Sequence, residues 1–105
     1  GFGAEAELEW IAGPPALVNT PAWADFALDL AQARGFATER GTPQMGGEDF
    51  VFYLHHVPGA FVSIGSASPF GLHHPGFDPD EGMLEAAVDY FTQLAPRALD
   101  IVASA

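Results

Sequence analysis

Residues 45–65 read MGGEDFVFYLHHVPGAFVSIG and contain the clearest structural signals in the chain. The apolar residues in the first half fit one face of a helix over about 48–56, which the Pro58-Gly59 pair would end. The apolar run that follows, residues 60–65, is typical of a buried strand. This stretch therefore predicts a helix followed directly by a strand.

Helical periodicity marks two further segments. A proline-led segment with regularly spaced apolar residues predicts a helix over about 21–34, and Gly35 is a natural stop. Asp80 and Glu81 suit the first turn of a last helix, whose apolar residues again fall at helical spacing. A proline in a helix interior is unfavourable, so we expect a kink or break at Pro96.

Strand signals complete the predicted order of elements. Residues 4–11 alternate between glutamate and apolar side chains. This period of two residues is typical of a strand with one solvent-exposed face. Residues 36–40 can form a short strand. The resulting alternation of strands and helices predicts an α/β fold. Its internal strands are too few to make a sheet with a substantial core, so we expect them to pair with something absent from this chain.

Composition excludes several classes of function. The 105 residues include 14 acidic and 3 basic side chains, so the formal net charge is −11. This balance repels phosphate backbones and anionic membrane surfaces, which argues against nucleic-acid and membrane partners. There is no cysteine, and no apolar run approaches the ~20 residues of a membrane-spanning helix. The chain opens at Gly1 without a methionine, so we expect a fragment of a longer protein.

Two histidine pairs are candidates for chemistry. Pro75 favours extended backbone at His74, so the side chains of His73 and His74 diverge, and one of the two can serve as a metal ligand. A surface histidine without function is the alternative, because one histidine is not a metal site. The pair at residues 55–56 lies near the end of a predicted helix, where the helix dipole accounts for it without a function.

The Gly46-Gly47-Glu48-Asp49 stretch is the other candidate. Two glycines let the backbone approach a ligand, and the amides at a helix start attract anions. Two carboxylates, however, put negative charge at that same end. A helix start with acidic first-turn residues is therefore the alternative interpretation.

Together these motifs are more specific than any one of them. The stretch at 45–65, followed by LHHPGFDPDEGMLEAAVDYF at 72–91, resembles the C-terminal part of the metal-dependent amidohydrolases that include hippurate hydrolase and N-acyl-amino-acid amidohydrolases. These enzymes belong to the aminoacylase and carboxypeptidase superfamily. ALVNTP at 16–21 is similar to the stretch where their chain leaves the lid, or dimerisation, domain.

The resemblance implies a domain organisation and a site. Residues 1–18 would be the last lid strand and the hinge, and residues 19–105 would be the C-terminal part of an interrupted catalytic domain. Asn19 matches the hinge position. The last metal ligand of these enzymes matches His73. The residues that the resemblance places on the substrate side of the site are Gly46, Gly47, Glu48 and Asp49.

The resemblance also implies an activity. Such enzymes hydrolyse the amide bond of N-acyl amino acids with two divalent ions, which can be zinc, manganese or cobalt, and we expect a cytoplasmic homodimer. Their other ligands and their general-base glutamate lie upstream, so no catalytic residue is expected in this chain. We expect the chain to be inactive without the rest of the parent catalytic domain.

Two other interpretations remain open. The chain can be a non-enzymatic binding or oligomerisation module derived from the same fold, with exposed apolar surface that drives association. It can also be a self-contained metal-binding domain in which His73 acts with Asp78 or Glu48. One histidine with carboxylates would bind zinc weakly.

Overall fold

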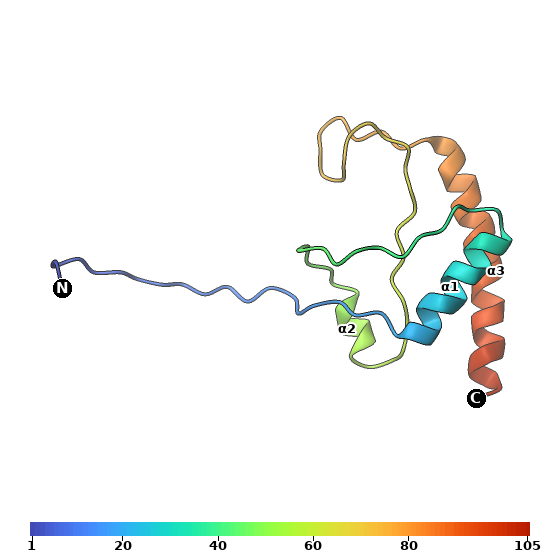
Figure 1. Ribbon diagram of the computed structural model, residues 1–105, viewed down its shortest axis with the longest axis horizontal. Helices are drawn as coiled ribbons and strands as arrows, with labels where there is room; N and C mark the ends of the chain where they lie inside the picture. The colour runs from blue at the N-terminus through green and yellow to red at the C-terminus, as the bar shows by residue number, and fades with distance from the viewer.

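The computed structural model describes all residues from Gly1 to Ala105. It contains three helices: α1 at Pro21–Ala33, α2 at Val51–Leu54 and α3 at Glu81–Ala103. Figure 1 shows α1 lying against α3, with the short α2 apart from both. None of the helices is long and apolar enough to cross a bilayer.

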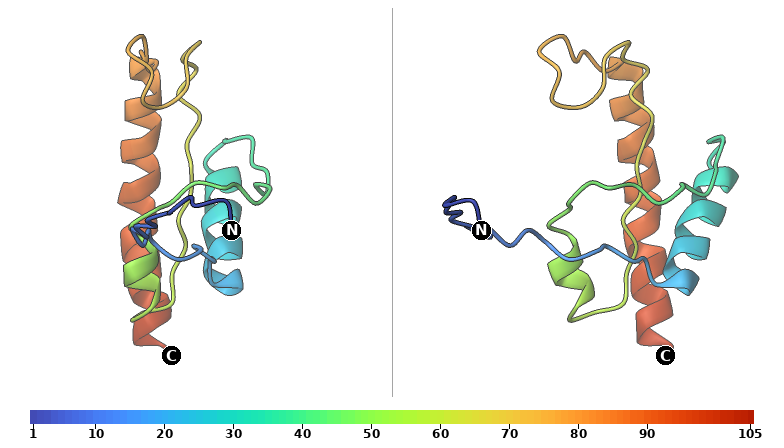
Figure 2. Two further views of the ribbon diagram at one scale, coloured as in Figure 1. Left: turned by 90° about the vertical axis from the view of Figure 1, so that its left-hand side faces the viewer. Right: turned by 60° about the vertical axis from the view of Figure 1, so that its left-hand side comes forward.

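Helix α1 forms where the sequence predicts it. Thr20 has the extended backbone of an N-cap, and Pro21 occupies the first helical position, where its missing N–H costs nothing. The helix ends at Ala33, and Gly35 follows with a φ of 91°, a conformation that glycine adopts without strain. The two views in Figure 2 show that the chain then turns back along the side of the helix.

Helix α3 is longer than predicted. The Asp80 carboxylate caps it by accepting a hydrogen bond from the Gly82 N–H at 2.8 Å, and Glu81 lies in the first turn, as expected. Of the kink or break expected at Pro96, the break is wrong, because the helix continues through the proline to Ala103. The residues around the proline are mostly alanine, leucine and arginine, which are strong helix formers, and this propensity offsets the missing hydrogen bond.

The core of the molecule is small. Four side chains are buried, and they are Ala27, Leu30, Val51 and Tyr90. Tyr90 of α3 donates a hydrogen bond from its hydroxyl to the Ala27 carbonyl of α1 at 3.0 Å, and burial raises the pKa of Tyr90. Arg34 and Asp89 join the same helices through two hydrogen bonds of 2.8 and 2.7 Å.

The predicted α/β fold is wrong for this chain, because the structure contains no strand. Residues 4–11, 36–40 and 60–65 are non-helical, but no backbone hydrogen bond joins any two of these segments. Alternation and apolar runs are properties of one segment, whereas a strand exists only when a second segment pairs with it. The predicted helix at 48–56 is also shortened to Val51–Leu54.

The overall shape is open. The radius of gyration is 18.8 Å, whereas a compact chain of this length has about 13 Å. An N-terminal arm, residues 1–18, runs past α2 to the start of α1, and its first part extends away from the helices and accounts for the long axis (Figure 1). Much of α3 is also uncovered, since Val88 is 66% and Phe91 is 51% exposed. The chain therefore buries little of its apolar surface.

Candidate functional site

The loop that carries the histidine pair closes on itself. We name Ser66–Asp80 the 66–80 loop. At its base, the Asp80 N–H donates to the Ser66 carbonyl at 2.8 Å. Further in, the Ser68 hydroxyl accepts hydrogen bonds from the N–H groups of Phe70 and Asp78, both at 3.2 Å. A compact surface loop with adjoining ends and internal contacts is often a functional element.

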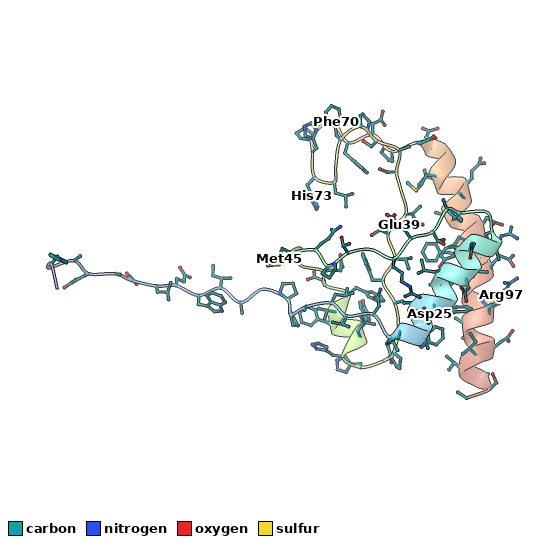
Figure 3. All side chains as sticks on the ribbon, in the orientation of Figure 1. Asp25, Glu39, Met45, Phe70, His73 and Arg97 are labelled. Atoms are coloured by element: carbon teal, nitrogen blue, oxygen red, sulfur yellow. The ribbon has the colours of Figure 1, made fainter.

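His73 lies at the tip of the 66–80 loop with a free side chain. It is exposed, and its imidazole takes part in no hydrogen bond, ion pair or aromatic contact. Its φ is 67°, in the left-handed region that few residues other than glycine adopt. Figure 3 shows the ring pointing away from the loop, toward the turn that carries Met45. Both ring nitrogens are therefore accessible to a ligand.

His74 is held by its neighbours instead. Its ring stacks on Phe70, with centroids 4.2 Å apart and planes inclined by 3°. Its Nδ1 accepts a hydrogen bond from the Gly76 N–H at 2.9 Å. Of the two adjacent histidines, one is thus engaged in the loop and the other is free.

The four residues of the Gly46–Asp49 stretch have different surroundings. A Cβ on Gly47 would lie 2.9 Å from Cγ of Pro14, so this glycine permits a close approach of the N-terminal arm, whereas nothing lies within 4 Å of such an atom on Gly46. The Glu48 carboxylate accepts from the Phe50 N–H at 3.1 Å. Asp49 is exposed. The contacts of Gly47 and Glu48 are those of packing and of a capped turn.

The donor set for a metal ion is incomplete. No group of three or more His, Asp or Glu side chains comes close enough to hold an ion. A free imidazole fits one ligand position of a zinc-type site, but such sites need three or four protein ligands. The interpretation as a self-contained metal-binding domain with Asp78 or Glu48 is therefore wrong. Of the adjacent pair, His73 is the histidine with a free ring.

Three residues that make contacts within the 66–80 loop are absent from the sequence prediction: Phe70 and Gly76, which contact His74, and Ser68. Their roles depend on contacts across the 66–80 loop, and spacing alone does not reveal such contacts. The available signal is the Phe-x-x-x-His-x-Gly pattern at 70–76, in which an aromatic residue and a glycine flank the second histidine.

Comparison with known proteins identifies relatives among deacetylases. The chain is 35% identical over 102 residues to N-acetylcysteine deacetylase from Bacillus subtilis (strain 168). This alignment covers 97% of this chain and 27% of that protein. It is 39% identical over 90 residues to N-acetyldiaminopimelate deacetylase from Streptococcus sanguinis (strain SK36), covering 84% of this chain and 24% of that protein. The chain thus spans about a quarter of the length of these relatives. No solved structure matches it.

The family profile covers most of the chain. Residues 4–97 match the peptidase family M20/M25/M40. The matched range includes the Gly46–Asp49 stretch, the 66–80 loop and all three helices except the last turns of α3. The amidohydrolase resemblance seen in the sequence is thereby confirmed. On this match and these relatives, the chain belongs to the peptidase family M20/M25/M40.

Proposed function

We propose that this chain is part of a metal-dependent amidohydrolase that cleaves the amide bond of N-acyl amino acids. The observation that carries the proposal is the free imidazole of His73 at the tip of a closed loop, in a chain of the M20 family. Relatives named as deacetylases of N-acetylcysteine and N-acetyldiaminopimelate support an N-acyl amino acid as substrate. Hippurate, an N-benzoyl amino acid, is a second substrate to test.

His73 is proposed as one ligand of a divalent metal centre whose other ligands come from outside these residues. A divalent ion bound there would supply Lewis-acid chemistry, through polarisation of the scissile carbonyl and activation of water. Gly46, Gly47, Glu48 and Asp49 are proposed to border the substrate. This role is compatible with the Glu48–Phe50 hydrogen bond, which occupies one carboxylate oxygen. The chain holds no residue that we assign as general base.

The domain assignment follows the same reasoning. We assign residues 1–18 to the end of a lid or dimerisation domain and its hinge, and residues 19–105 to the catalytic domain. The N-terminal arm lacks contacts over most of its length, whereas every helix lies after residue 18. A homodimer of the parent protein is part of this proposal.

The test compares the 105-residue chain with the longer polypeptide recovered from source cells. Each is assayed with N-acetylcysteine, N-acetyldiaminopimelate and hippurate after loading with zinc, manganese or cobalt. We expect hydrolysis by the longer polypeptide alone. In His73→Ala the rate should fall by more than about 100-fold, because removal of a metal ligand should cost more than removal of a residue that only hydrogen-bonds to a ligand. His55→Ala, at another exposed histidine, is the matched control.

One observation favours a second candidate function. With four buried residues and large apolar side chains exposed on α3, the chain can act as a binding or oligomerisation module. A native product of 105 residues that forms discrete oligomers in sedimentation analysis, and shows no hydrolysis, would support this function. A native product several times longer would exclude it.

A further inference from the structure

The backbone of His73 occupies a conformation that needs support. At a φ of 67°, a residue with a Cβ is strained, and such strain persists only where the surrounding structure holds it. His73 itself contributes no side-chain contact to the 66–80 loop. The restraint on His73 therefore comes from other residues of that loop.

Two layers of contacts surround His73. The outer layer is the pair of Ser68 hydrogen bonds to the N–H groups of Phe70 and Asp78, which joins the two arms of the loop. The inner layer lies directly after His73. The His74 N–H donates to the Gly71 carbonyl at 3.3 Å, and the His74 carbonyl accepts from the Phe77 N–H at 2.9 Å. His74 is thus bonded through its backbone to both sides of the tip.

The side chain of His74 adds the third restraint. Its near-parallel stack on Phe70 fixes the plane of the ring, and the Gly76 N–H fixes its rotation. Gly76 also makes room for the stack, since a Cβ there would lie 2.9 Å from both Cδ2 and Cε2 of Phe70. Phe70, His74 and Gly76 form one packed unit, which we name the 70–76 clamp.

The clamp also decides which histidine is available to a metal ion. A neutral imidazole has one nitrogen that bears the proton and one that carries the free lone pair. In His74 the lone pair of Nδ1 accepts the Gly76 N–H, so a metal ion can bind this ring only by displacing that hydrogen bond. In His73 no hydrogen bond occupies the lone pair.

We propose that Phe70, His74 and Gly76 are positioning residues that present His73 as the metal-binding histidine and withhold His74. This inference rests on the proposed function, in which His73 is a metal ligand. It adds that the second histidine of the motif is a structural part of the loop. A substitution that opens the clamp therefore makes the two histidines equivalent.

The experiment uses NMR spectroscopy of the isotope-labelled 105-residue chain at about pH 8, where histidine is ordinarily neutral. Without metal, the clamp predicts two signals. The ring protons of His74 shift upfield because they lie over the Phe70 ring, and His73 shows the strong NOE between its own amide and α protons that marks a positive φ. Titration with Ni²⁺ then broadens the ring signals of His73 at about fivefold lower concentration than those of His74, since binding at His74 has to displace one hydrogen bond.

Two variants open the clamp by different routes. Phe70→Leu removes the stacking ring, and Gly76→Ala inserts a methyl group against it while leaving both rings in place. In each variant we expect loss of both metal-free signals and similar broadening of the two histidines. Phe70→Tyr keeps a stacking ring and should restore the fivefold difference.

Matched controls separate the clamp from general damage to the loop. Gly71→Ala adds the same methyl group where nothing lies within 4 Å, and Phe77→Leu removes a ring of the same loop that stacks on nothing. Both should keep the wild-type signals. Equal broadening of His73 and His74 in the wild-type chain, or a fivefold difference that survives Phe70→Leu and Gly76→Ala, would overturn the inference.

The result is independent of the hydrolysis assay. If His73→Ala leaves hydrolysis by the longer polypeptide unchanged while the Ni²⁺ selectivity follows the clamp, the proposed function fails and the account of the loop stands. If hydrolysis depends on His73 but the two histidines broaden alike, the positioning roles of Phe70, His74 and Gly76 fail alone.

Discussion

The side chain of Asn19 pairs with the backbone of Phe61 in both directions. Its Nδ2 donates to the Phe61 carbonyl at 2.9 Å, and its Oδ1 accepts from the Phe61 N–H at 2.8 Å. Thr20 repeats the arrangement with Gly59, through its N–H at 2.9 Å and its hydroxyl at 3.1 Å. The point where the N-terminal arm meets the rest of the chain is therefore fixed to the segment that follows α2.

Removal of the Asn19 carboxamide tests this junction. Asn19→Ala leaves the N–H and the carbonyl of Phe61 without partners, and we expect the free energy of unfolding to fall by about 1–2 kcal/mol for the two bonds. The measurement is urea denaturation together with amide hydrogen exchange, in which the Phe61 amide should lose its protection. Thr20→Val is the control, because it removes one bond at Gly59 and keeps both at Phe61. Unchanged exchange at Phe61 in Asn19→Ala would contradict the pairing.

The Arg34–Asp89 pair should contribute weakly to the packing of α1 on α3. Its two hydrogen bonds match the planar guanidinium to the carboxylate, but the side chains are 39% and 46% exposed. A double-mutant cycle with Arg34→Ala and Asp89→Ala should give a coupling of about 0.5–1 kcal/mol that decreases with added salt. The more exposed Arg40–Asp25 pair is the comparison and should couple less. A larger coupling for Arg40–Asp25 would refute this order.

The helices were predictable because their signals are local. Pro21 and Gly35 mark the two ends of α1 within a few residues of chain, and Asp80 caps α3 through a neighbour two positions away. At α2 the same local signals mislead. Glu48 is placed in a first helical turn by the sequence, whereas its carboxylate binds the Phe50 N–H ahead of the helix.

The strands and the support of the site were not predictable in this way. The pattern at residues 4–11 indicates a segment with one solvent-exposed face, but nothing in that segment indicates whether a partner strand exists. Similarly, the resemblance to the amidohydrolases singles out His73, which the structure leaves free, yet the stack of His74 on Phe70 depends on how the 66–80 loop closes. Contacts between residues four or more positions apart in an irregular loop leave no periodic trace.

Replacement of Pro96 should strengthen α3. Proline has no N–H, so the Thr92 carbonyl one turn earlier lacks its helical partner. Pro96→Ala restores this bond, and we expect more helical signal in circular dichroism and up to about 3 kcal/mol of added helix stability. Amide exchange around residues 92–100 should slow. Pro79→Ala, outside the helix, is the control and should change neither quantity; a loss of helical signal in Pro96→Ala would argue against a continuous α3.

Tyr90 should make the stability of the molecule fall in alkaline solution. Burial raises the pKa of Tyr90 above its ordinary value of 10.0, so the unfolded chain loses the phenolic proton before the folded chain does. The stabilising contribution is therefore complete below about pH 10 and decreases as the pH rises through the folded-state pKa. The chain has no lysine and no cysteine, the other side chains that ordinarily lose a proton in this range. Urea denaturation between about pH 9 and 11.5 measures the slope of the unfolding free energy against pH.

Two variants identify the group responsible. Tyr90→Phe should abolish this slope and cost about 1 kcal/mol at neutral pH through loss of the hydrogen bond to Ala27. Tyr53→Phe, at a 67% exposed position, should leave the slope in place. A slope that persists in Tyr90→Phe and vanishes in Tyr53→Phe would show that Tyr90 is not the buried group.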